Sequence, residues 1–193
     1  LLPYFNILPK NISTHPLTWV DEQVRQMLHG QSHAYVVYRA YRDMLRSEYD
    51  SLFPTGKWDD RTIPVEQYTH YRVLVLTRSF GTGLPKDVDT VQLDQIRRLT
   101  GVNLTQGCRS MVPILDMYDH HANPNVEWKY DFEQEAFLIR SSKHIPAGSV
   151  IYDSYGKYTD AHLFAKFGFV NGDGTDYTEV SLATMHRMMD VGL

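Results

Sequence analysis

Apolar side chains along the first 80 residues recur with the 3.6-residue period of amphipathic helices. This pattern predicts a helix over residues 18–30 with Thr18 as its cap, and a second helix over residues 38–52. A third helix is predicted over residues 64–80, because a proline at the start suits the first turn. Residues 85–107 are polar and are expected to hold at most one short helix.

After residue 107 the pattern changes to the alternation typical of strands. Apolar and polar side chains alternate over residues 126–130, and a polar turn separates them from residues 137–140, which predicts a β-hairpin. A further strand is expected at residues 150–152, and a helix with Thr159 as its cap at residues 158–167. A helical block followed by a mostly β block indicates an α+β protein.

Composition excludes several classes of protein. The chain has 193 residues, of which 42% are hydrophobic and 22% charged, and this is enough to bury a core. Its net charge of −4 argues against a long basic surface, so we expect no direct nucleic-acid binding. A single cysteine, Cys108, excludes an intramolecular disulfide, and the apolar runs are too short to predict a membrane span. The chain begins with Leu1 rather than Met, so we expect it to be a piece of a longer protein.

A dense cluster of polar side chains follows an apolar stretch at residues 111–115. The adjacent His120 and His121 point to opposite sides of an extended chain, and no helical His-x-x-His spacing accompanies them, so we expect no metal site. By themselves these residues favour a loop whose side chains bond the backbone. The cluster consists of Asp116, Asp119, His120, His121, Asn123 and Asn125.

A second motif changes this interpretation. Ser154-Tyr155-Gly156, read together with Asp119-His120 and Pro124-Asn125, resembles the C-terminal half of a SET domain, the S-adenosylmethionine-dependent protein lysine methyltransferase fold. That family has Asn-His, then Pro-Asn, and later Asn-Tyr-Gly with the active-site tyrosine. The N-terminal Pro3-Tyr4 and the segment 76–80 are similar to the Rubisco large-subunit methyltransferase branch, in which a helical insert interrupts the SET core.

The resemblance implies a SET fold with small β-sheets and a pseudoknot-like C-terminal segment. Residues 1–18 would end the N-terminal SET portion, and residues 19–106 would form the helical insert. Residues 107–170 would form the C-terminal SET core, and residues 171–193 would begin a following region. The branch has plastid, nuclear and cytoplasmic members, so we expect a compartment inside the cell without choosing among them.

The resemblance also assigns roles to individual residues. Tyr155 would be the catalytic residue, and Arg78 would hold the carboxylate of S-adenosylmethionine. The alternatives for Arg78 are an internal carboxylate partner or a side chain that extends to solvent. The remaining cofactor-binding residues would be Asp116, Met117, Tyr118, Asp119 and His120, and the substrate channel would include Phe80, Tyr152 and Phe167.

The resulting prediction is methyl transfer to a lysine side chain of a protein substrate. Two departures from the family pattern raise the alternative of a degenerate SET domain that acts as a scaffold or assembly subunit of a multiprotein complex. Asp119, which we expect to be buried, replaces the family's Asn, and the Gly-x-Gly segment that supplies part of the cofactor pocket is not in this chain. Transfer to a histidine nitrogen is a third alternative.

Overall fold

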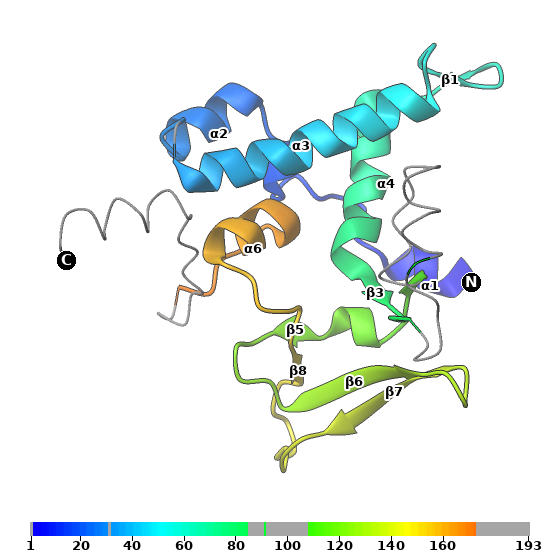
Figure 1. Ribbon diagram of the computed structural model, residues 1–193, viewed down its shortest axis with the longest axis vertical. Helices are drawn as coiled ribbons and strands as arrows, with labels where there is room; N and C mark the ends of the chain where they lie inside the picture. Colours follow the sequence, from blue (N-terminus) through cyan, green and yellow to red (C-terminus); the bar gives the residue numbers. More distant parts are fainter. Residues whose placement is uncertain (1, 31, 85–90, 92–107, 173–193) are drawn as a thin grey trace. The chain divides into compact units, whose positions relative to one another are not determined.

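The computed structural model describes residues 2–30, 32–84, 91 and 108–172 (Figure 1). The chain divides into two compact units. Unit 1 comprises Leu1–Ile12 and Trp58–Tyr155, and unit 2 comprises Ser13–Lys57 and Gly156–Leu193. Each unit therefore combines two segments that lie far apart in the sequence. Apart from Val91, the short helix expected within residues 85–107 lies outside the described residues.

Unit 2 is helical, and its helices α3 and α6 pack side by side (Figure 1). The long helix α3 buries one face, because its buried side chains recur at helical spacing. None of the described helices is long and apolar enough to span a membrane. The elements of unit 2 are η1 (Pro16–Thr18), α2 (Asp21–Met27), α3 (His33–Leu52) and α6 (Asp160–Phe167).

Both ends of α6 follow from the sequence. The Thr159 side chain accepts a hydrogen bond from the backbone N–H of His162 and so caps the first turn, as predicted. Gly168 ends the helix in the left-handed conformation, with φ of 84°. The prediction that Thr18 caps α2 is wrong, because Thr18 ends η1 and its hydroxyl donates to the carbonyl of His15. The N-cap of α2 is Val20, which makes no side-chain cap.

Unit 1 consists of helices and small sheets, as expected for an α+β protein. Its hairpin of β6 (Val126–Asp131) and β7 (Ala136–Ser141) pairs Trp128 with Ile139 and confirms the predicted alternation (Figure 1). The β1 and β2 strands pair where the chain passes from unit 2 to unit 1. The other elements, all in unit 1 except for Lys57 of β1, are α1 (Leu2–Ile7), β1 (Lys57–Trp58), β2 (Arg61–Thr62), α4 (Val65–Arg78), β3 (Ser79–Gly81), β4 (Arg109–Met111), η2 (Leu115–Met117), β5 (Asp119–His120) and β8 (Tyr152–Asp153).

The third predicted helix ends earlier than expected. The α4 helix stops at Arg78, and Phe80 lies in β3, which pairs antiparallel with β4. The Phe80 ring is buried edge-on against Trp128, with 5.0 Å between ring centroids, and it also contacts Phe137. Packing against the hairpin therefore outweighs the helical period at this position. The position of the helix end matters for the site, because it makes Arg78 the last residue of α4.

Candidate active site

Pairing of β5 with β8 brings the two sequence motifs together. These strands run parallel, with Asp119 opposite Tyr152 and His120 opposite Asp153. Two residues beyond β8, the backbone N–H of Tyr155 donates to Nδ1 of His120 at 3.1 Å, and the centroids of the two rings lie 5.2 Å apart. Residues 35 positions apart in the sequence thus form one site within unit 1.

Asn125 fixes the strand that carries Tyr155. Its side-chain Nδ2 donates to the carbonyl of Val150 at 2.9 Å, and its Oδ1 accepts from the backbone N–H of Tyr152 at 2.8 Å. Its own backbone N–H donates to the carbonyl of Tyr152. One side chain therefore satisfies backbone groups on both sides of the start of β8. Because the Asn125 side chain binds the Val150 carbonyl, this carbonyl is not part of a strand pair, and β8 comprises Tyr152–Asp153 rather than the predicted residues 150–152.

The hydroxyl of Tyr155 has a fixed direction. It donates a hydrogen bond of 2.7 Å to the backbone carbonyl of Tyr118. Burial, followed by the nearby charges of Asp153 and Asp119, raises the pKa of Tyr155 to about 12. At neutral pH the side chain is therefore an uncharged phenol, and its oxygen can still accept hydrogen bonds.

Arg78, at the end of α4, and Asp116, in η2 before β5, form an ion pair. Nη1 of Arg78 lies 3.2 Å from Oδ2 of Asp116 and donates to the carbonyl of Asp116 at 2.9 Å. Their side chains are 20% and 0% exposed, so this pair is largely removed from solvent. The structure therefore contains the internal carboxylate partner that was one of the alternatives for Arg78. Within the described part of the chain, Nη1 makes all the hydrogen bonds of this guanidinium, including one of 3.5 Å to the sulfur of Met117.

Tyr4 is part of the same network, a role that the sequence did not reveal. Its hydroxyl donates to Oδ2 of Asp116 at 2.7 Å, across 112 positions in the sequence. Burial raises the pKa of Tyr4, and the hydrogen bond to Asp116 raises it further. The second oxygen of Asp116, Oδ1, is buried and makes no hydrogen bond to a described residue. The Pro3-Tyr4 signature placed Tyr4 in the family pattern, but only the fold brings it to Asp116.

The loop before β5 is strained, and one expectation about it is wrong. Ile114 has φ of 78° and ψ of −50°, which is unfavourable for a β-branched residue, and it directly precedes η2. Asp119, which was expected to be buried, is exposed. Alternation along β5 explains this, because the side chain of Asp119 faces out while that of His120 turns toward Tyr155.

The predicted substrate-channel residues fall in different units. Phe80 and Tyr152 lie in unit 1, where the Tyr152 ring packs against the ring of His121 at 5.2 Å. Phe167 lies in unit 2. There Nζ of the buried Lys166 lies 4.7 Å from the centroids of both the Phe167 and Tyr158 rings, and it donates to the Tyr158 hydroxyl at 2.8 Å. The channel role of these three residues stays a prediction.

Asp153 is a second residue that the sequence did not single out. It lies on β8, opposite His120 of β5, and its side chain is fully buried. Neither of its carboxyl oxygens makes a hydrogen bond to another described residue. Burial, together with the negative charge of Asp119, raises the pKa of Asp153 to about 7. The sequence gives no local signal for this burial, because Val150 and Ile151, which precede β8, are both exposed.

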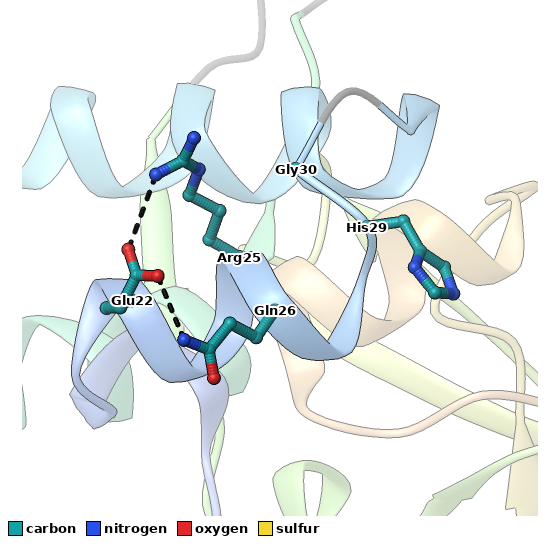
Figure 2. A pocket seen from close by; sticks show the side chains of 5 residues that line it. All are labelled: Glu22, Arg25, Gln26, His29 and Gly30. Carbon is teal, nitrogen blue, oxygen red and sulfur yellow. Dashed lines mark hydrogen bonds and ion pairs between the residues drawn. The ribbon is translucent and has the colours of Figure 1, made fainter.

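A hollow of about 500 Å³ lies elsewhere, on α2 in unit 2 (Figure 2). Glu22 accepts from Arg25 at 3.4 Å and from Gln26 at 3.0 Å, so its charge is already paired (Figure 2). The remaining lining residues are His29 and Gly30, and none of the lining residues belongs to the predicted site. Among the described residues, no group of three or more His, Cys, Asp or Glu side chains could hold a metal ion.

Comparison with known proteins gives both sequence relatives and a structural neighbour. No family model matches the chain. Human N-lysine methyltransferase SETD6 is 26% identical over 96% of this chain and 38% of the relative. The Bos taurus enzyme of the same name is 25% identical over 96% and 40%, and the Xenopus laevis enzyme is 24% identical over 99% and 41%. The chain thus spans about two fifths of the length of these relatives.

The structural neighbour is Rubisco LSMT, in a structure bound to sinefungin and monomethyllysine. It matches with a TM-score of 0.55 and 17% sequence identity, over 88% of this chain and 35% of that chain. These findings confirm the resemblance that the two sequence motifs indicated. The chain has the SET-domain methyltransferase fold of Rubisco LSMT, and its sequence relatives are SETD6 N-lysine methyltransferases.

Proposed function

We propose that the protein containing this chain transfers a methyl group from S-adenosylmethionine to a lysine side chain of a protein substrate. One observation carries the proposal: the oriented hydroxyl of Tyr155 lies beside the loop of residues 116–120, within a single unit. The names of the SETD6 relatives and the lysine bound to Rubisco LSMT support lysine as the acceptor.

The polar groups of the site suit this methyl donor. S-Adenosylmethionine has an α-amino acid end, and when bound it supplies a methyl group on a positively charged sulfur. Arg78 would hold the carboxylate of that end, because Nε and Nη2 are not engaged by any described residue and a guanidinium binds carboxylates in pairs of hydrogen bonds. Asp116, Met117, Tyr118, Asp119 and His120 would border the rest of the molecule. The sinefungin bound to Rubisco LSMT is an analogue of this donor and supports the assignment.

Methyl transfer to an amine requires alignment and a neutral acceptor, and it needs no covalent nucleophile. A lysine side chain ordinarily has a pKa of about 10.4, so it must lose a proton before it reacts, and a desolvated aromatic channel favours this loss. The hydroxyl proton of Tyr155 is donated to the Tyr118 carbonyl, so toward the reacting groups the phenol oxygen would act as a hydrogen-bond acceptor. Tyr155 would therefore orient the acceptor while remaining neutral itself.

Some finer assignments are part of the same proposal. Residues 19–106 would form the helical insert of this branch and help to position the protein substrate. Phe80, Tyr152 and Phe167 would line the lysine channel. The scaffold and histidine alternatives are not favoured, because the relatives are lysine methyltransferases. Asp119 is exposed, so its carboxylate can be solvated and no cost of a buried charge counts against methyltransferase activity.

A labelling experiment tests the reaction and its acceptor. The intact protein would be incubated with S-adenosylmethionine labelled in the methyl group and with a cell protein extract. Acid hydrolysis of the labelled proteins should release methyl-lysine. Release of methyl-histidine would identify the other acceptor, and no label despite measurable cofactor binding would favour a scaffold role. A Tyr155→Phe variant in the same extract is the control for transfer by other enzymes.

A further inference from the structure

Asp153 is a buried acid that the proposed mechanism does not use. Its side chain is 0% exposed, and neither carboxyl oxygen makes a hydrogen bond to another described residue. A buried carboxyl without partners is costly when charged and costs less when protonated. A positive charge bound nearby would make its ionisation favourable.

The position of Asp153 in the fold places it at the proposed site. On β8 it lies opposite His120 of β5, its carbonyl accepts from the N–H of His121, and Tyr155 follows two residues later. The phenol of Tyr155 is affected by the charge of Asp153 and, more weakly, by that of Asp119. Any other charge brought to the Tyr155 hydroxyl would be affected in the same way, because burial limits screening by solvent.

The charged groups around Asp153 come from two strands. On β5, Asp119 is the neighbour whose charge opposes ionisation of Asp153. His120, opposite Asp153 in the pairing of β5 with β8, is the other ionisable side chain of β5. The β6 strand also contacts β8. The charged residues of β6 are Glu127, Lys129 and Asp131.

We propose that Asp153 is a specificity-determining residue that favours binding of the cationic methyl donor over its neutral product. The inference rests on the proposed function, since it concerns the same site. S-Adenosylmethionine carries a positive sulfur, whereas S-adenosylhomocysteine carries an uncharged thioether at that atom. The two molecules differ only in this methyl group and its charge, so a negative charge near Tyr155 favours the donor over the product.

Proton exchange at Asp153 couples donor binding to product release. With a pKa of about 7, Asp153 is close to half protonated at neutral pH. Binding of a cation beside Tyr155 favours the carboxylate, so the carboxylic acid releases its proton to the buffer. In the transfer the nitrogen–methyl bond forms as the sulfur–methyl bond breaks, and the positive charge passes from the sulfur to the methylated nitrogen. Once the methylated side chain leaves the site or gives its proton to the buffer, only the uncharged thioether remains and the carboxylate recovers a proton. The product then loses an electrostatic attraction that the donor had, which favours its release.

Paired calorimetric titrations test this directly on the intact protein. Dissociation constants for S-adenosylmethionine and S-adenosylhomocysteine are measured from pH 5.5 to pH 8.5, in buffers of different ionisation enthalpy. The preference for the donor should rise by roughly threefold or more across this range, because the carboxylate that forms attracts the cationic sulfur and does not attract the uncharged thioether. Donor binding at pH 7 should release up to about half a proton, given the pKa of about 7, and product binding should release fewer.

Two variants assign the effect to one carboxyl. Asp153→Asn keeps the shape of the side chain and should make the donor preference independent of pH. Asp60→Asn makes the same chemical change in the exposed turn between β1 and β2 and should leave the pH dependence intact. If Asp153→Asn does not fold, the proton release by the unaltered protein still decides the matter.

The outcomes separate this inference from the proposed function. If both ligands bind and their ratio is the same at all pH values, the role of Asp153 is wrong while the methyltransferase proposal stands. A pH dependence that persists in Asp153→Asn assigns the effect to another group, such as His120, and also overturns the inference. If neither ligand binds, both proposals fail together.

Discussion

The hydroxyl of Tyr4 donates a hydrogen bond of 2.7 Å to Oδ2 of Asp116, the same oxygen that pairs with Arg78. One carboxylate oxygen thereby connects the first helix of the chain to the end of α4 and to the loop before β5. The side chain of Asp116 is fully buried, so both donors compensate for the lost solvation of its charge.

Replacement of Tyr4 by Phe should therefore lower the free energy of unfolding by about 2 kcal/mol, the contribution of a hydrogen bond to a charged group. Chemical denaturation of the intact protein measures this. Tyr71→Phe is the matched control, because Tyr71 is 60% exposed, and we expect a change below about 0.5 kcal/mol. Equal effects of the two substitutions would show that the Tyr4 hydrogen bond is not significant for stability.

Arg78 and Asp116 should show strong energetic coupling. Arg78→Met leaves a buried carboxylate with one donor fewer and should cost about 3 kcal/mol. Asp116→Asn in the same molecule removes that charge, so the double variant should lose less stability than the sum of the two single variants, by about 1 kcal/mol or more. Urea denaturation of the unaltered protein, the two single variants and the double variant measures the four free energies of unfolding. Strictly additive losses of this free energy would contradict the ion pair.

We expect the buried His15 to make the stability of unit 2 sensitive to acid. Its ring is buried, and Nδ1 accepts from the N–H of Leu17 while Nε2 lies 3.1 Å from the carbonyl of Lys166. Burial lowers the pKa of His15 below its ordinary value of about 6.5. Between those two values the unfolded chain binds more protons than the folded one, so stability is complete above about pH 6.5 and is lost as the pH falls through the folded pKa.

The measurement is the free energy of unfolding from pH 7.5 down to pH 5, for the unaltered protein and for His15→Gln. Glutamine can donate to the Lys166 carbonyl but does not titrate, so the variant should lose part of the slope, at most about 1.4 kcal/mol per pH unit. His144→Gln, at an exposed site, should keep the full slope. If the two variants gave the same slope, His15 would not be the group responsible.

Glycine is required at position 168 because of its positive φ and because of a close contact with His15. Gly148 shares only the positive φ, so comparing the two positions distinguishes the two causes. Gly168 has φ of 84°, and a Cβ there would lie 3.1 Å from Cδ2 of His15. Gly148 has a similar φ of 81° but nothing within 4 Å of its Cβ position. Gly148→Ala should cost about 1 kcal/mol of backbone strain, and Gly168→Ala should cost more because of the added contact. Thermal unfolding compares them, and equal losses would mean that the contact with His15 adds nothing.

The sequence predicted those features that depend on local patterns. The period of α3, the Thr159 cap and the alternation of the β6–β7 hairpin are all visible in neighbouring residues, and the structure has them. Two motifs also sufficed to predict that Tyr155 meets the loop of residues 119–125, because their order and separation match the SET pattern.

The remaining features depend on contacts between distant segments, which local patterns do not contain. Phe80 leaves its helical period because the hairpin offers an aromatic surface some 50 residues later. Tyr4 reaches Asp116 across 112 positions, and no spacing rule predicts that contact. Asp153 was missed because an acid between Tyr152 and Ser154 looks like a surface residue until the parallel pairing of β5 and β8 encloses it.

The central claim is that the Tyr155 hydroxyl takes part in methyl transfer rather than in building the pocket. The most direct test compares Tyr155→Phe with the unaltered protein in two measurements, the dissociation constant for S-adenosylmethionine and the rate of methyl-lysine formation. We expect the dissociation constant to change less than about threefold and the rate to fall about a hundredfold, as when one positioned hydrogen-bonding group is removed from an active site. An unchanged rate, or a fall explained entirely by lost cofactor binding, would contradict this role.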